Sequence, residues 1–197
     1  MNHTVILTIG FPGSGKSTVA RAIANSLGAT YLDKDTICNG FTGLLLELNG
    51  ESANARDNST LYKEKIMPME YQTLFKAAND TLSSNQFIVI DAPFISFFDD
   101  PSYIKNQREA LNWTDVNVCV IEVTARLDIT KERLIQRGEK RDLWKLDNWE
   151  SFSQRISQQT CSWDHVNKFS FDNSATSPNV DQLVQDIKNT TLKSDNQ

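Results

Sequence analysis

Residues 10–17, GFPGSGKS, constrain the fold of this 197-residue chain more than any other segment. They follow the apolar run TVILTI and precede TVARAIANSLG, a stretch with helical periodicity that ends at Gly28. Three glycines in eight residues allow left-handed backbone conformations and a close approach of the main chain to a ligand. The segment therefore predicts a turn between a strand and a helix in which backbone groups do the binding.

The same segment satisfies the pattern G-x-x-x-x-G-K-[ST]. In that arrangement successive N–H groups converge on phosphate oxygens, and the helix N-terminus adds its positive dipole end. Lys16 would bridge the β- and γ-phosphates of a nucleotide, and the Ser17 hydroxyl would ligate Mg²⁺. The alternative is a glycine-rich turn with an incidental lysine. The predicted phosphate-binding residues are Gly10, Gly13, Ser14, Gly15, Lys16, Ser17 and Thr18.

Apolar runs without strict polar alternation recur along the chain, which is typical of strands covered on both faces in a parallel sheet. Helical patterns separate them, so we expect a three-layer α/β/α sandwich around a five-stranded, mainly parallel sheet. One domain over residues 1–190 and a frayed tail at 191–197 would account for the whole chain. The predicted strands span residues 4–9, 29–33, 87–91, 116–123 and 168–172, and the helical patterns cover 17–28, 68–84, 127–138 and 179–192.

Composition excludes some classes of protein. A net charge of −5 and a pI near 5.1 argue against a dedicated binder of nucleic acid or anionic membranes. The longest apolar stretches fall well short of the roughly 20 residues that span a bilayer, and the N-terminus has no basic leader. Cys38, Cys119 and Cys161 are scattered, as in a reduced protein. We therefore expect a cytoplasmic protein without a membrane partner, whose oligomeric state the sequence leaves open.

The signatures of other P-loop classes, such as N-K-x-D and D-x-x-G, are missing from the expected places. What remains resembles the P-loop small-molecule kinases: shikimate and gluconate kinases, chloramphenicol phosphotransferase, zeta-toxin-like kinases and the kinase half of polynucleotide kinase. The resemblance implies a nucleoside-kinase-like fold, with ATP and Mg²⁺ as cofactors. It also implies transfer of the γ-phosphoryl group to a hydroxyl of a small molecule, such as a sugar, an antibiotic, a nucleoside or a nucleotide-sugar.

Carboxylates follow two of the predicted strands. YLDKDTI, residues 31–37, looks like the D-x-D of shikimate-type kinases. By that resemblance Asp35 faces the acceptor hydroxyl as general base or orienter, and Asp33 contacts Mg²⁺ through water. Asp91 ends the strand FIVID before Pro93 and matches a Walker-B-type acid near Mg²⁺. Each aspartate could instead cap a helix or turn.

Basic residues are concentrated between Arg126 and Lys145. If the helix continues, Arg133, Arg137 and Arg141 share one face with no acid three or four positions away, which is unfavourable unless an anion neutralises them. ERLIQRGEKR resembles the helix and lid of these kinases, with the lid at residues 138–150. The resemblance implies that Arg137 lies against adenine or phosphates and that Arg141 closes over the γ-phosphoryl group. A solvated basic face is the alternative.

The remaining candidates are weaker. FDNSATSP, residues 171–178, resembles the loop that reads adenine, with Asn173 and Ser174 as candidates, although the composition also suits an ordinary turn. Residues 36–67 fit the strand–helix rhythm poorly and would form a mobile helical excursion that selects the acceptor. The predicted acceptor contacts are Arg56, Tyr62 and Phe94.

Two other functions stay open. One is a polynucleotide 5′-kinase, which the acidic balance disfavours because nucleic acid calls for a basic channel. The other is a nucleotide-gated ATPase switch or binding module, which would have no need of a carboxylate on the acceptor side.

Overall fold

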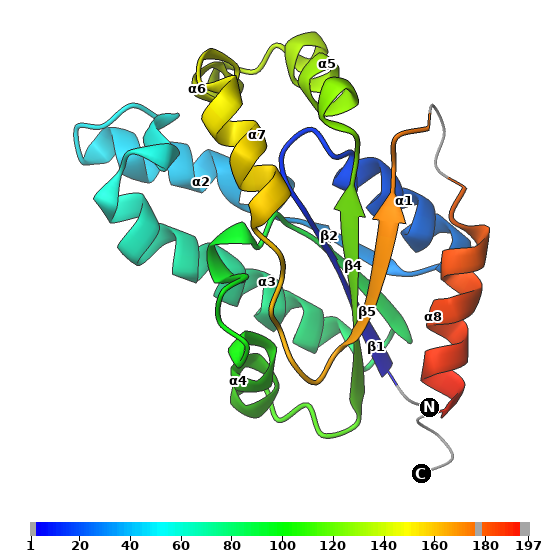
Figure 1. The fold of residues 1–197 in the computed structure, drawn as a ribbon. Coiled ribbons are helices and arrows are strands. Elements are labelled where there is room, and N and C mark those ends of the chain that lie inside the picture. Colours follow the sequence, from blue (N-terminus) through cyan, green and yellow to red (C-terminus); the bar gives the residue numbers. More distant parts are fainter. Residues whose placement is uncertain (1–2, 176–178, 194–197) are drawn as a thin grey trace.

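A computed structural model describes residues 3–175 and 179–193. Its centre is a five-stranded sheet with the order β2-β3-β1-β4-β5, in which all neighbouring strands are parallel (Figure 1). The predicted sheet is confirmed strand by strand. The strands are β1 (His3–Ile9), β2 (Thr30–Asp33), β3 (Phe87–Asp91), β4 (Val116–Thr124) and β5 (Asn167–Asp172).

Helices connect the strands, and three of them, α4, α6 and α7, lie outside the helical patterns of the sequence. Short 3₁₀ turns lie at Ala55–Asp57, Ile95–Phe97 and Lys140–Asp142, and a π-helical segment spans Tyr62–Ile66. The helices are α1 (Lys16–Leu27), α2 (Lys34–Leu48), α3 (Met67–Thr81), α4 (Tyr103–Ala110), α5 (Leu127–Arg137), α6 (Leu143–Asp147), α7 (Trp149–Gln158) and α8 (Asp181–Lys193). Residues 194–197 of the expected tail lie outside the described residues.

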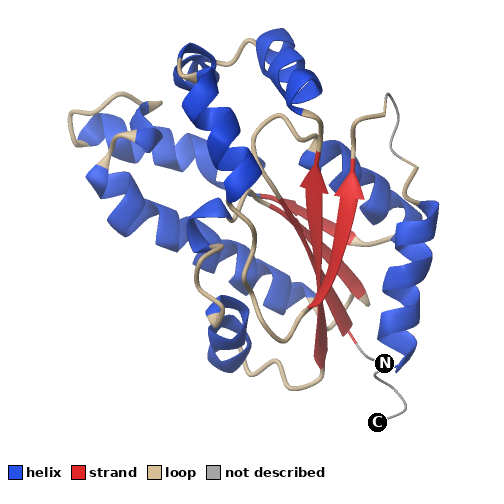
Figure 2. Cartoon of the chain, in the orientation of Figure 1, coloured by secondary structure: helices blue, strands red, loops and turns tan. Residues whose placement is uncertain are grey.

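Both faces of the sheet are covered, as the continuous apolar strands predicted (Figure 2). Alternate strand residues such as Ile6 and Ile121 face α1 and α8 and form one core with them. Their neighbours Val5 and Val120 belong to the other core, which α3, α4 and α7 close. These two cores make the three-layer sandwich and fix the strand ends that carry the candidate site.

The excursion at residues 36–67 is more regular than its glycines suggest. Helix α2 continues through Gly40 and Gly43, although each glycine costs about 1 kcal/mol in a helix interior. Burial of Cys38, Thr42 and Leu46 on its inner face offsets that cost. The π-helical segment then leads directly into α3.

Over residues 3–175 and 179–193, no helix combines the length and apolar character that crossing a bilayer requires.

Candidate active site

The loop between β1 and α1 has the conformation that its glycines predict. Gly10, Gly13 and Gly15 have φ values of 139°, 86° and 84°. A Cβ atom on Gly10 would lie 2.4 Å from the Val123 carbonyl oxygen, so a side chain cannot be accommodated there. Within the described structure, α1 starts with neither a side-chain cap nor an acidic residue in its first turn. Its first N–H groups are therefore left for an anion.

The outer side of this loop is held by two side chains from distant segments. The Ser14 carbonyl accepts hydrogen bonds from the Asn173 amide at 2.9 Å and from Arg133 Nη1 at 3.2 Å. Arg133 Nη2 also donates to the Asn173 carbonyl at 2.8 Å. Because the Ser14 carbonyl is held on the outer side of the loop, the N–H groups of the loop can line its inner side, where an anion would bind. Arg133 had no assigned role in the sequence interpretation, because its partners are backbone atoms that no residue pattern reveals.

The loop after β5 is therefore tied to the phosphate loop and to α5. Asn173 is buried, and its amide is engaged with Ser14. The Ser174 hydroxyl accepts the Arg126 N–H at 2.9 Å, just before α5 begins. Contact of Asn173 and Ser174 with adenine stays a prediction, and residues 176–178 of that loop lie outside the described residues.

Asp33 and Asp91 lie opposite each other at the carboxyl ends of β2 and β3. Asp33 caps α2 by accepting the Asp35 N–H at 2.8 Å, so the capping role is present. Asp91 is buried and accepts the Tyr31 hydroxyl at 2.8 Å. Burial, together with the neighbouring Asp91 carboxylate, raises the pKa of the Tyr31 phenol, which keeps it a donor.

This donor set fits Mg²⁺. In the described part of the chain, no group of three or more acidic, histidine or cysteine side chains could hold a metal ion by itself. Mg²⁺ is commonly held by one or two carboxylates, with waters and substrate phosphates completing its shell. Asp33 and Asp91 at the strand ends and the exposed Ser17 hydroxyl at the start of α1 supply donors of that kind.

A cavity of about 240 Å³ opens beside Lys16. Its walls come from the phosphate loop, α2, the excursion, the lid and α7. Burial lowers the pKa of Lys16, although the Asp91 and Asp35 carboxylates raise it in part. The cationic lining residues outnumber the acidic ones in a chain whose net charge is −5. They are Lys16, Lys34, Arg56, Arg137, Arg141, Lys145 and Arg155, against Asp35, Asp57 and Asp142.

Two residues predicted to act together meet in this cavity. Arg141 Nη1 donates to Asp35 Oδ2 at 2.5 Å. Burial acts to raise the pKa of Asp35, but the charges of Arg141, Lys34 and Arg56 outweigh it and hold that pKa below its usual range. The Asp35 carboxylate is therefore kept ionised.

Helix α5 does not continue through Arg141, so Arg133, Arg137 and Arg141 do not share one face. The predicted helix end at Gly138 is confirmed. Helix α5 ends at Arg137 because Gly138 adopts the left-handed conformation, with φ of 63°. Arg137 instead donates through Nε to the buried Asp142 at 2.8 Å, within the lid. Separate partners for Arg133, Arg137 and Arg141 remove the like-charge stacking that the helical pattern implied.

A buried ion pair lies beneath Asp35. Lys34 Nζ donates to Glu70 Oε2 at 2.8 Å, and the two side chains are 5% and 4% exposed. Glu70 also accepts the Tyr62 hydroxyl at 3.0 Å and the Thr42 hydroxyl. This network connects α2, the π-helical segment and α3. Neither its lysine nor its glutamate was singled out from the sequence, since their pairing appears only in the folded chain.

The predicted acceptor residues differ in how the structure places them. Arg56 and Tyr62 line the cavity, and the Arg56 guanidinium lies 5.7 Å from the centre of the Tyr62 ring. Among the described residues, Arg56 Nε is buried without a hydrogen-bond partner.

The placement of Phe94 corrects the sequence interpretation. Its ring is fully buried and packs against Tyr71 at 4.8 Å and Trp163 at 5.5 Å, so it cannot line an acceptor site. Phe11 and Phe152, whose ring centres lie 6.3 Å apart, form the aromatic wall instead.

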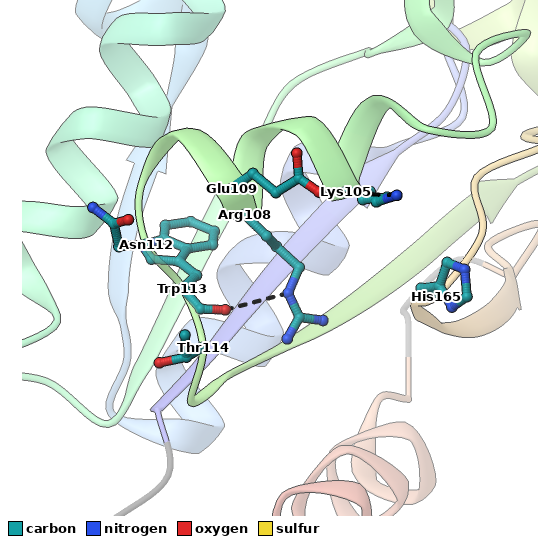
Figure 3. Close-up of a pocket in the computed structure, with 7 residues that line it drawn as sticks. All are labelled: Lys105, Arg108, Glu109, Asn112, Trp113, Thr114 and His165. Carbon is teal, nitrogen blue, oxygen red and sulfur yellow. Dashed lines mark hydrogen bonds and ion pairs between the residues drawn. The ribbon is translucent and has the colours of Figure 1, made fainter.

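Figure 3 shows the residues that line a second, open hollow. This hollow has a volume of about 680 Å³ and shares no lining residue with the first cavity. Arg108 and His165 line it, and Arg108 Nε donates to the Trp113 carbonyl at 3.4 Å. Thr114, also in its lining, comes just before β4, so the hollow is at the amino ends of the strands. The phosphate loop follows the carboxyl end of β1, which makes the 240 Å³ cavity the candidate active site.

Comparisons with known proteins show the family and the fold of this chain. The sequence profile of the AAA domain family matches residues 5–158. A shikimate kinase from Chlorobium phaeobacteroides is 45% identical over 42 residues, which are 21% of this chain and 22% of that protein.

Solved structures with the same fold include a candidate kinase from Chloroflexus aurantiacus, with a TM-score of 0.66 and 17% identity over 96% of this chain and 98% of that one. A sugar kinase from Janibacter has a TM-score of 0.53 and 13% identity over 98% and 95% of the two chains. The chain therefore belongs to the AAA domain family, and its fold is that of the P-loop small-molecule kinases.

Proposed function

We propose that the protein is an ATP-dependent phosphotransferase that moves the γ-phosphoryl group of ATP to a hydroxyl of a small molecule. One observation supports this most: a single cavity is lined by Lys16 of the phosphate loop and by the paired Asp35 and Arg141. A phosphate site alone serves any nucleotide-binding protein. A carboxylate aimed at the same cavity is what transfer to a hydroxyl needs.

On the donor side, the N–H groups of residues 13–18 and Lys16 would hold the phosphates. Ser17, Asp33 and Asp91 would hold Mg²⁺, which neutralises the charge of the β- and γ-phosphates when bound. Asn173, Ser174 and Arg137 would contribute to the rest of the nucleotide site.

In the transfer step, the acceptor oxygen forms a bond to the γ-phosphorus while the bond from that phosphorus to the β–γ bridging oxygen breaks. ADP leaves, and the proton of the hydroxyl passes to Asp35 and then to solvent. Because the pKa of Asp35 is low, its first task is to orient the hydroxyl, and it takes the proton late. When ATP binds, Arg141 would release Asp35 and donate its hydrogen bonds to the oxygens of the γ-phosphoryl group.

The acceptor would be small and would carry an anionic or hydroxyl-rich group. Support comes from the cavity volume of about 240 Å³ and from the buried Arg56 Nε that lacks a protein partner. A sugar, a nucleoside, a nucleotide-sugar or an antibiotic remains compatible with these features.

The deciding experiment is transfer of labelled γ-phosphate from ATP to a panel of sugars, nucleosides, antibiotics and fractionated metabolites. Lys16→Ala serves as the blank, because it removes the phosphate-bridging cation. A labelled product above that blank is the expected result. Labelling of an oligonucleotide alone would favour a polynucleotide 5′-kinase, and ATP consumption without any labelled acceptor would favour a nucleotide-gated switch.

A further inference from the structure

One face of α2 exposes four large apolar side chains. The exposed fractions are 74% for Phe41, 54% for Leu44, 41% for Leu45 and 74% for Leu48. Their spacing of i, i+3, i+4 and i+7 places all four on one stripe of the helix. The opposite face, which includes Leu46, is buried against the body of the protein. Helix α2 therefore has an inner face that packs on this chain and an outer apolar face, the α2 stripe, that does not.

The α2 stripe is too large for an ordinary scatter of surface apolar residues. A fully exposed leucine or phenylalanine presents about 200 Å², so the four exposed fractions amount to roughly 500 Å² of apolar surface. The largest apolar patch on a typical monomer measures about 300–600 Å² and is often functional, so the α2 stripe is a candidate interaction surface. Between Thr36 and Leu48 the one charged residue is the exposed Glu47, so the stripe offers a partner a single charge to pair with.

We propose that the α2 stripe binds the α2 stripe of a second copy of this chain, antiparallel and across a two-fold axis. In that arrangement Phe41 packs against the partner's Leu48, and Leu44 lies near the axis, opposite the partner's Leu44. Gly40 has open space at its Cβ position, which lets the two helices approach closely. Two stripes bury about 1,000 Å² in total, the lower limit for a specific interface, so the dimer is weak and reversible.

Other occupants fit the surface less well. A helix that lies on a membrane carries lysine or arginine beside its apolar face. The single basic residue of α2 is Lys34, which is buried against Glu70. A charged partner would find a single complementary charge, Glu47, between Thr36 and Leu48.

The proposed contact is separate from the candidate active site. Phe41 lies six residues beyond Asp35 along α2, and in the described structure none of the four stripe residues lines the 240 Å³ cavity. Dimer formation can therefore be tested without reference to phosphoryl transfer.

Sedimentation velocity over a wide range of protein concentration tests the dimer. The sedimentation coefficient of the natural chain should rise with concentration and rise further with added salt, which screens repulsion between two copies of charge −5. Leu48→Glu should remain monomeric throughout. Ile135→Glu, which changes an equally apolar side chain 58% exposed on α5, should behave like the natural chain.

Disulfide trapping tests the geometry. Leu44→Cys should form a covalent dimer under mild oxidation, because the two thiols would meet near the axis, whereas Ile135→Cys should not. The natural thiols of Cys38 and Cys119 are buried, but Cys161 is partly exposed, so both variants are made in a chain that carries Cys161→Ser. A natural chain that stays monomeric at every concentration, or equal effects of Leu48→Glu and Ile135→Glu, would overturn the proposal. Capture of the chain by phospholipid vesicles through the stripe, without self-association, would overturn it as well.

Discussion

The two sides of the candidate active site are built from different material. The donor side is main chain: three glycines with positive φ and the first turn of α1. The acceptor side is a set of charged side chains from α2, the excursion and the lid, held by ion pairs such as Arg141–Asp35 and Lys34–Glu70. A backbone site leaves a short, continuous motif in the sequence. A side-chain site can use residues from anywhere in the chain, and it can change its ligand without changing the fold.

The largest expected effect is on the acceptor side. Asp35→Asn should lower kcat by roughly 10²- to 10⁴-fold, because the amide can neither orient the hydroxyl as a charged acceptor nor take its proton. The affinity for ATP, measured by calorimetry, should stay nearly constant if the two sides are as separate as their construction indicates. Unchanged turnover in Asp35→Asn would remove Asp35 from the mechanism.

Next in size is the buried ion pair. Glu70→Gln should lower the free energy of unfolding by about 3–5 kcal/mol, because it leaves the buried Lys34 ammonium without its counter-charge. Urea unfolding provides the measurement. Glu64→Gln, an exposed position in the π-helical segment, is the matched control and should change stability by less than about 0.5 kcal/mol. Equal stability of the two variants would show that the acceptor side does not depend on this pair.

Arg133 is the side chain that tests whether the donor side depends on the backbone alone. Arg133→Gln removes the charge-assisted bonds to the Ser14 and Asn173 carbonyls. It should weaken ATP binding by roughly tenfold. Hydrogen bonds to a charged group contribute about 1.5–3 kcal/mol, and part of that loss falls on the loop itself rather than on nucleotide binding. Arg126→Gln, an exposed change just before the same helix, should leave ATP affinity unaltered. If Arg133→Gln binds ATP normally, the glycine loop holds its shape alone.

The smallest expected effect is a displacement of the pH profile. Arg141 helps to hold the pKa of Asp35 below its usual range. The loss of kcat/KM on the acidic side of the pH profile, its acidic limb, should therefore occur at low pH. In Arg141→Gln that pKa rises, and the normalised limb should move to higher pH. Arg141→Lys retains the charge and should leave the limb near its original position. An acidic limb that is identical in all three proteins would mean that Asp35 does not set it.

These differences explain what the sequence could and could not predict. The five strands and the phosphate loop follow from local patterns, apolar runs and glycine spacing, and they were predicted with nearly correct bounds. The helix end at Gly138 was predicted, but the partners of the arginines were not, because pairs such as Arg141–Asp35 join segments that lie far apart in the sequence. Phe94 was misplaced for a related reason: an aromatic residue after a strand suits a core and a pocket equally well, and only packing decides.

The π-helical segment at Tyr62–Ile66 affects how this chain should be compared with its relatives. A π-turn contains one more residue than an α-turn. A relative with an uninterrupted α-helix here would be one residue shorter, and an alignment without a gap would pair Tyr62 with the wrong position. Deleting one residue from the segment would rotate everything before it by about 100° relative to α3. Tyr62 would then lose its bond to Glu70, so a single-residue deletion could redirect the acceptor side while every catalytic residue is retained.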